Sequence, residues 1–531
     1  MRKNIIFIGV SICLLLLLGI GLSYSMWNMS ISQGTNNVIA TTNDCFDIAI
    51  TSQENSIKLE NAYPISDTKG KTLTPFTFTI KNTCDMSASY TVSLESLKGS
   101  TLSSQFLKVM VNDNDPKILN TLDSTDTVNS GSIESRVLDT GTIFKNKTKE
   151  YSIRLWIDYD TTMEDLNNET KVLKSRIIIK GVPSDEEEPA PDLLTERIPY
   201  LAERDTVNLS SDDSDSNVRY IGANPDNYVY FNCSDYSNQT ADTCEKWRII
   251  GLFNNTEKGD GTLENLVKIV RNDSLGSFIW DGKKNGVGTS TSNNGSSDWT
   301  DSQLMMMLNP TDYLKFGYYD ANDVVLVDSD ELYKNMGAYY NGTVGCKPNA
   351  ISAGATFSCN SVDFTSTGLK TNITRNAIEE VVWNLGGMVA SSNLSPTDFY
   401  TAEKGANVYI GHATTWAGKI GLIYPSDYAY ATAGGSIANR STCLSSTMNN
   451  WVNLDDCYSN NYLHKLSQWT ISPDSVNDSV VFFADTIGIV DSFSAIEDFN
   501  LAVYPSLYLK SSFTVKTGDG SENSPYQLNI E

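Results

Sequence analysis

The chain of 531 residues carries 64 acidic against 39 basic side chains, which gives a formal net charge of −25, and it has only two histidines. Such a surface repels the phosphates of nucleic acids and of anionic membranes, so neither is expected as a partner. An apolar content of 40% and an aromatic content of 10% suffice for folded cores, and the length predicts two or three domains.

Residues 1–31 are predicted to form a targeting segment. Arg2 and Lys3 precede an almost wholly apolar run from Ile5 to Leu22, and small serines follow it. This order is typical of a secretory signal peptide, and the run is also long enough to remain as a transmembrane anchor. Both alternatives place the protein outside the cell or on its surface, where the membrane is a partner only through this segment.

Residues 32–182 are predicted to form a β-sandwich of the immunoglobulin or jelly-roll type. The segments "PFTFTIKN" and "YSIRLWID" alternate apolar with polar residues, as half-buried strands do, and "SYTVSLESL", "FLKVMVN" and "SRIIIKG" add further strands. Because no clear amphipathic helix interrupts them, two packed sheets are favoured. Residues 183–217 are interpreted as a linker, since "SDEEEPAPD" and "NLSSDDSDSN" bury little apolar area.

Residues 218–531 have the pattern of a mixed α+β domain. The strands "NYVYFNC" and "EKWRIIGLF" flank a loop with two cysteines and predict a hairpin, in which Trp247 and Ile249 enter the core. The segment "WTDSQLMMMLN" predicts a helix capped by Thr300, and "TRNAIEEVVWNLGG" predicts a second helix capped by Thr374 and ended by its two glycines. The methionines and both apolar stripes are interpreted as core.

The eight cysteines beyond the targeting segment form an even set, as in a disulfide framework: Cys45, Cys84, Cys233, Cys244, Cys346, Cys359, Cys443 and Cys457. We predict that each cysteine pairs with its neighbour in this order. Zinc sites usually have closer spacings with histidines nearby, so no metal centre is predicted from the cysteines.

Little in the sequence indicates catalysis. His412 and His464 lie beside no nucleophile motif and are interpreted as loop or core residues. Abundant carboxylates leave glycoside hydrolysis open. No cofactor is expected, although acidic clusters in "DYDTTMED", "DSDE" and "GDGSEN" keep Ca²⁺ as an alternative.

Two resemblances to known families follow from particular segments. The layout of the first part, with "SYSMWN" and then "LTPFTFTIKNTC", resembles exported matrix proteins of the TasA and camelysin type in Gram-positive bacteria. From Tyr220 onward, "CEKWRIIGLF", "IGLIYPSDYAYA" and "AVYPSLYLKSSFTVKTGDGSENSPYQL" resemble a domain of unknown function in surface proteins of gut Firmicutes. That domain is similar to the C-type-lectin-like fold shared with formylglycine-generating enzymes, which implies a mixed α and β module with a variable loop surface.

We therefore expect a non-enzymatic, exported bacterial surface protein that presents a disulfide-stapled recognition domain to a glycan or a surface protein, as in adhesion. Its candidate binding residues are aromatic side chains, expected to be exposed near the loops, that can stack on sugars or anchor a partner: Trp416, Tyr424, Tyr428, Tyr430, Trp451 and Trp469. A structural subunit of a biofilm matrix or fibre is the alternative hypothesis. A glycosidase or a formylglycine-type oxidase is the third.

Overall fold

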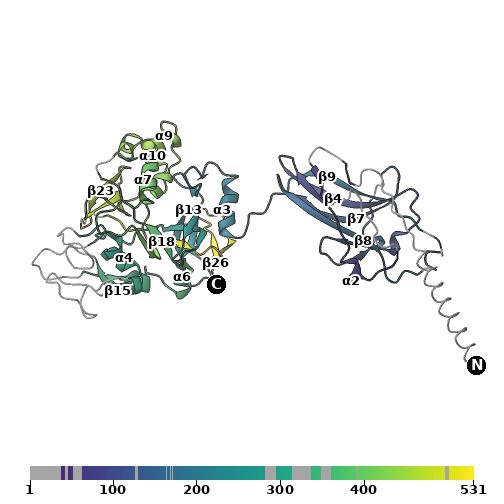
Figure 1. The fold of residues 1–531 in the computed structure, drawn as a ribbon. Coiled ribbons are helices and arrows are strands. Elements are labelled where there is room, and N and C mark those ends of the chain that lie inside the picture. Colours follow the sequence, from purple (N-terminus) through teal and green to yellow (C-terminus); the bar gives the residue numbers. More distant parts are fainter. Residues whose placement is uncertain are drawn as a thin grey trace, which may run out of the picture. The chain divides into compact units, whose positions relative to one another are not determined.

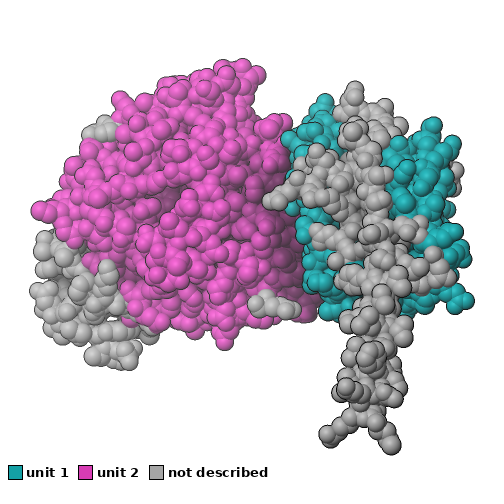
Figure 2. Space-filling model, turned by 45° about the vertical axis from the view of Figure 1, so that its right-hand side comes forward, with its two compact units in different colours: residues 1–189 teal, residues 190–531 magenta. Residues whose placement is uncertain are grey.

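The structure is a computed structural model that describes residues 38–41, 46–51, 63–125, 129–162, 164–167, 169, 171–281, 295–313, 336–347, 360–390, 393–496 and 501–530. The chain is rich in β-strands and divides into two compact units, residues 1–189 and 190–531 (Figure 2). The predicted multidomain, β-rich organisation is confirmed in this form. The apolar run of the targeting segment lies outside the described residues. Among the described residues, no helix has the length and apolar character needed to cross a membrane.

Two sheets share one core in the first unit (Figure 1). One sheet has the order β1 (Val38–Thr41), β9 (Ser175–Ser184), β4 (Ser87–Leu97), β7 (Ser132–Ile143), and the other has the order β2 (Phe46–Ile50), β3 (Phe76–Asn82), β8 (Thr148–Ile157), β5 (Leu107–Val111), β6 (Lys117–Ile118). The alternation predicted for β3 is present, because Phe76, Phe78 and Ile80 are buried and the threonines between them are half-buried. A short helix, α2 (Asp67–Gly70), lies near Trp156.

The second unit is built around a sheet with the order β10, β11, β13, β14, β24, β17, in which β12 also pairs with β13 and β20 with β24. These strands are β10 (Leu209–Ser210), β11 (Val218–Tyr220), β12 (Tyr228–Phe231), β13 (Glu245–Glu257), β14 (Leu263–Arg271), β17 (Ile378–Glu379), β20 (Ile420–Gly421) and β24 (Ser506–Leu509). All residues of β13 from Trp247 to Phe253 are buried, as expected for a central strand covered on both faces. Gly251 is required here, because any Cβ would lie 2.2 Å from the carbonyl oxygen of Val218 in β11.

Short helices and small sheets surround this central sheet. The helices are α3 (Leu194–Ala202), α4 (Gln303–Leu308), α5 (Ala338–Asn341), α6 (Asn372–Ala377), α7 (Pro396–Glu403), α8 (Pro425–Tyr430), α9 (Arg440–Ser445) and α10 (Asp455–Ser459). The remaining strands are β15 (Val344–Lys347), β16 (Asn360–Asp363), β18 (Val381–Asn384), β19 (Thr415–Gly418), β21 (Gln468–Pro473), β22 (Val480–Ala484), β23 (Val490–Ser494), β25 (Thr514–Thr517) and β26 (Gln527–Asn529). Helix α7 packs against α8 and α9.

The predicted linker is too long. The second unit begins at residue 190, and α3 places Leu194 and Ile198 in the core of that unit. Asp213 and Asn217 of the second polar run are also buried there. Hydrogen bonds between them satisfy their polar groups inside the unit. Polar composition predicted a tether, whereas these polar groups form part of the folded interior.

The second predicted helix is largely wrong. Helix α6 begins after Thr371, which caps it in place of Thr374, and it ends at Ala377. The following residues form β17 and β18, where Ile378 pairs with Leu509 and Trp383 with Trp416. The first predicted helix is closer to the structure: α4 starts after a Ser302 cap rather than Thr300, and its three methionines are buried as expected.

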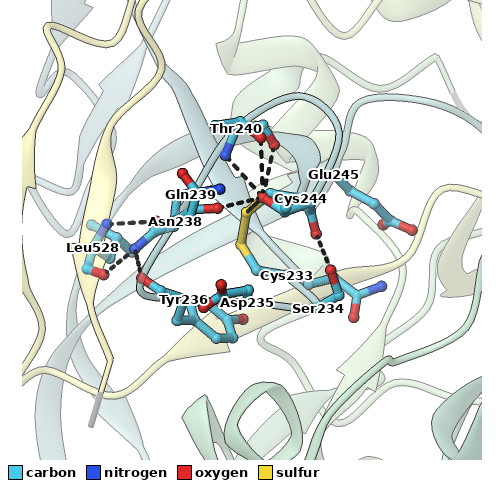
Figure 3. Close-up of a disulfide and its surroundings, with 12 residues drawn as sticks. Cys233, Ser234, Asp235, Tyr236, Asn238, Gln239, Thr240, Cys244, Glu245 and Leu528 are labelled. Carbon is cyan, nitrogen blue, oxygen red and sulfur yellow. Dashed lines mark hydrogen bonds between the residues drawn. A yellow bond between two sulfur atoms is a disulfide. The ribbon is translucent and has the colours of Figure 1, made fainter.

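Two of the predicted disulfides are present, Cys233–Cys244 and Cys443–Cys457, with sequence separations of 11 and 14 residues. The first closes the β12–β13 hairpin as predicted, next to the pair Phe231 and Glu245. Figure 3 shows Gln239 of this loop facing Leu528 of β26. The Gln239 Nε2 donates to the Leu528 carbonyl at 2.7 Å, and Gln239 Oε1 accepts the Leu528 backbone N–H at 3.1 Å. The loop is therefore fastened to its own hairpin by the disulfide and to β26 by two hydrogen bonds.

The remaining predicted pairs involve residues that the structure does not describe. Cys84 is disulfide-bonded, and Cys45, its predicted partner, lies outside the described residues. Cys346 belongs to β15, but Cys359 lies outside the described residues. These two pairings stay predictions.

Replacing Cys233 and Cys244 together by Ser is expected to lower the free energy of unfolding by about 2–4 kcal/mol, because the disulfide restricts the unfolded chain. Urea denaturation of the purified protein measures this change. The exposed Ser234 supplies a control, since Ser234→Ala leaves the disulfide in place. An unchanged midpoint in the double variant would contradict a stabilising role.

Candidate functional site

A pocket of about 450 Å³ is the candidate site in the second unit. Its lining comes from the stretch before and within β11, the end of β13, strand β18, the end of α7 and the start of α8, with Leu263 of β14, Thr415 of β19 and Tyr508 of β24. The lining combines rings with charged and amide groups, among them Asp215, Asn217, Arg219, Phe253, Trp383, Asn384, Tyr400, Glu403, Lys404, Tyr424, Asp427 and Tyr508. This composition is typical of sites for polar organic ligands.

Arg219 is the centre of a buried ion cluster at this pocket. Its Nε lies 2.8 Å from Oδ2 of Asp213, and its Nη1 lies 2.8 Å from Oδ1 of Asp427. Lys268 Nζ lies 2.5 Å from Oδ2 of the same Asp427. Although burial raises the pKa of Asp427, its two cationic partners outweigh that effect and hold the pKa below its ordinary value. Asp427 is therefore ionised and bound on both oxygens.

The local sequence explains how Asp427 reaches this position. Pro425 begins α8, where a missing N–H costs nothing. Asp427, two residues later, accepts the Tyr424 backbone N–H at 3.0 Å, which anchors its carboxylate at the helix start. The carboxylate then faces β11 and β14, which supply Arg219 and Lys268.

One polar atom of Arg219 remains without a partner. The residue is 2% exposed, and within the described part of the chain its Nη2 makes no hydrogen bond. The guanidinium lies 4.5 Å from the ring centre of Phe253 and 5.4 Å from that of Tyr400. An unsatisfied buried donor costs about 1–3 kcal/mol, which an acceptor that reached Nη2 would recover.

Glu403 is the second unusual group. It is 2% exposed, and one of its oxygens accepts the Ser426 backbone N–H at 2.9 Å while the other contacts the Ser426 hydroxyl. Burial raises the pKa of Glu403 to about 8, with a further contribution from the charge of Asp427, so this carboxyl is neutral at pH 7. It joins the cluster without adding a charge.

The charges at the pocket compensate one another. Arg219 and Lys268 pair with Asp213 and Asp427, and Lys404 contacts Asp215 at the rim. Asp215 also accepts the Tyr400 hydroxyl at 2.7 Å. With Glu403 neutral, the buried lining offers dipoles and rings rather than a net charge, while Glu257 and Thr415 lie exposed at the edge.

The expected exposure of the six candidate aromatics is wrong for five of them. Trp416, Tyr428, Tyr430, Trp451 and Trp469 are at most 4% exposed. Their polar atoms and rings are used internally, because the Trp451 indole donates to the Cys443 carbonyl at 3.2 Å and the Trp469 indole donates to the Phe278 carbonyl at 2.9 Å. Tyr424 is half-buried and lines the pocket; its hydroxyl donates to the Asn384 carbonyl at 3.0 Å.

The two histidines are not at this pocket. His412 lies with Nδ1 3.5 Å from the Ser297 hydroxyl, and His464 lies with Nδ1 3.0 Å from the Tyr428 hydroxyl. Burial lowers the pKa of both. Both are half-buried polar residues, as the sequence indicated.

The acidic clusters considered for Ca²⁺ do not converge where they are described. Across the described ranges, no three His, Cys, Asp or Glu side chains gather as a metal site would require. Asp519 instead accepts the Ser521 backbone N–H at 2.9 Å, as a turn residue does. The segment "DSDE" at 328–331 lies outside the described residues.

Sequence reasoning missed Arg219, Glu403 and Asp427. The available signal was Arg219 itself, a charged residue within the otherwise uncharged run "VRYIG". Comparisons with models of protein families and with curated proteins give no match for this chain. The geometry of the pocket is therefore what indicates a function for this chain.

Proposed function

We propose that the protein is an exported bacterial surface protein that binds a glycan through the pocket around Arg219. In this proposal the first unit is a β-sandwich of the immunoglobulin or jelly-roll type that acts as a spacer, and the second unit is a C-type-lectin-like recognition domain. The two described disulfides support an oxidising compartment such as the cell exterior. The N-terminal segment would supply export or anchoring.

The buried, unpartnered Nη2 of Arg219 at a ring-lined pocket is the observation that carries this function. A sugar hydroxyl supplies the acceptor that this donor lacks, and the C–H face of a sugar packs on rings such as Tyr424. Compensated charges at the pocket favour an uncharged ligand over an ion. A neutral saccharide satisfies all three conditions.

Binding is better supported than hydrolysis at this pocket. Glycoside hydrolysis needs an ionised carboxylate that is available as base or nucleophile, together with an acid. Both oxygens of Asp427 are held in ion pairs, and both oxygens of Asp213 accept hydrogen bonds from Asn217. Glu403 has the raised pKa of an acid, but its oxygens are occupied by Ser426.

An array of neutral saccharides probed with the purified protein tests the proposal. Thr415 is exposed and lines the pocket, so Thr415→Trp is expected to block the entrance and to reduce binding at least about tenfold. Ala417 is an exposed residue on the same strand that does not line the pocket, so Ala417→Trp is the matched control and should bind normally. No bound saccharide, or equal binding by the two variants, would refute the assignment.

A further inference from the structure

A second pocket in the same unit, of about 620 Å³, shares no lining residue with the first. It lies on the side of β13 that presents Arg248, and Lys465 joins it from the chain after α10. Tyr228, Tyr462 and Tyr504 supply aromatic walls. Its chemistry differs from that of the first pocket because its two cations are not neutralised.

Arg248 is buried, with 3% of its surface exposed, yet no carboxylate within the described residues forms an ion pair with it. Its Nε donates to Asn227 Oδ1 at 2.5 Å, and its Nη2 donates to the Pro225 carbonyl at 3.3 Å. Its guanidinium lies 3.7 Å from the ring centre of Tyr228. These neutral partners orient the cation and leave its charge uncompensated, and burial lowers its pKa accordingly.

Lys465 is held in the same way. Its Nζ donates to the Asn272 carbonyl at 2.5 Å and to Asn272 Oδ1 at 3.1 Å, and it lies 5.4 Å from the ring centre of Tyr504. No ion pair of Lys465 occurs in the part of the chain that the structure describes. Burial, followed by the positive charge of Arg248, lowers its pKa to about 8, although the charge of Asp273 acts in the opposite sense.

One acid, Asp273, lines this pocket and offsets only part of the two positive charges. Asp273 is exposed, and its carboxylate accepts a hydrogen bond from Asn272 at 3.1 Å. Glu522, whose charge acts on Arg248, is paired with Lys246 at 3.5 Å. Two like charges that repel each other in one pocket are stabilised by an anion placed between them. In a chain with a net charge of −25, such a positive pocket stands out.

We propose that this second pocket binds the oxyanion group of an acidic saccharide, such as the carboxylate of a uronic acid. Arg and Lys donate charge-assisted hydrogen bonds to an oxyanion, and the tyrosine rings pack against the sugar that carries it. The inference extends the proposed glycan recognition to a second, acidic sugar unit, but it depends on other residues than the first pocket does.

Titration calorimetry of the purified protein tests this site with three probes: glucuronate, glucose and inorganic sulfate. We expect glucuronate to bind, glucose to give no heat at this site, and added salt to weaken glucuronate binding. If sulfate binds with the same affinity as glucuronate, the pocket is an oxyanion site whose ligand is a free anion, and the assignment to a saccharide is wrong. Glucuronate that binds no better than glucose would overturn the proposal.

Variants connect the result to the pocket. Lys465→Met is expected to weaken glucuronate binding at least about tenfold, and Lys465→Arg is expected to restore most of it, because the positive charge returns. Lys516→Met removes an exposed cation that lines neither pocket and should leave glucuronate binding unchanged. Thermal unfolding of each variant shows whether it is folded. Equal binding by wild type and a folded Lys465→Met variant would refute the site, whatever the result for Thr415→Trp.

Discussion

Replacing Arg219 by Met is expected to lower the free energy of unfolding by about 3–5 kcal/mol, because two buried carboxylates lose a shared cation. Asp213 would keep only neutral donors, and Asp427 would keep Lys268 as its one cationic partner among the described residues. Charges so far from water cannot be rehydrated without opening the pocket. Urea unfolding followed by tryptophan fluorescence measures the loss.

The matched control for Arg219 is Lys258→Met. Lys258 pairs with Glu264 at 3.2 Å, but both side chains reach solvent, with exposures of 21% and 37%. The loss of such a solvent-screened pair is expected to change the free energy of unfolding very little. Similar losses in the two variants would show that the cluster around Arg219 does not stabilise the fold.

Glu403→Gln is expected to flatten the pH dependence of stability between pH 4.5 and pH 8. The folded state holds the Glu403 proton up to a pKa of about 8, whereas the unfolded chain releases it near the ordinary value of 4.5. The folded state thus binds more protons within this window, so the free energy of unfolding falls as pH rises, by roughly 1 kcal/mol per pH unit. The contribution is complete below pH 4.5 and absent above pH 8.

Denaturation series at several pH values measure this slope in wild type and in Glu403→Gln, whose side chain has no proton to lose. Glu257→Gln is the control, because Glu257 borders the same pocket but is exposed. The control should retain the wild-type slope. If Glu403→Gln also retains it, Glu403 is ionised in the folded protein and the buried lining carries a net negative charge.

Local patterns predicted the strands of the first unit and the cysteine hairpin well. Over residues 76–82, buried and less buried side chains alternate because successive residues of a strand point to opposite faces of the sheet, which is a local property. The hairpin at Cys233 and Cys244 joins strands that are neighbours in sequence. The pattern at Ile378 and Val381 was misleading because apolar spacings of three and four residues also fit two short strands separated by a bend. Strands of two and four residues are too short for their apolar positions alone to distinguish them from a helix.

The pocket could not be derived from local patterns, because its contacts join distant segments. Arg219 and Asp427 are 208 positions apart, and nothing in the run "SDDSDSN" distinguishes a buried Asp213 from a solvated one. The predicted exposure of the aromatics was wrong for a related reason. A ring beside a polar loop becomes part of the core when a segment distant in sequence covers it. Tyr424 was the exception, because it lies where α8 starts at the pocket.

The parallel pairing of β1 with β9 has a mechanical consequence. Val38 pairs with Ile177 and Thr41 with Lys180, so the first described strand and the strand that leads out of the first unit run in the same direction. Tension applied between the chain before β1 and the chain after β9 pulls these strands lengthwise past each other. Their hydrogen bonds then bear the load together in shear, instead of opening one after another as in an unzipping hairpin. We therefore expect the first unit to resist rupture when it is pulled between these two ends.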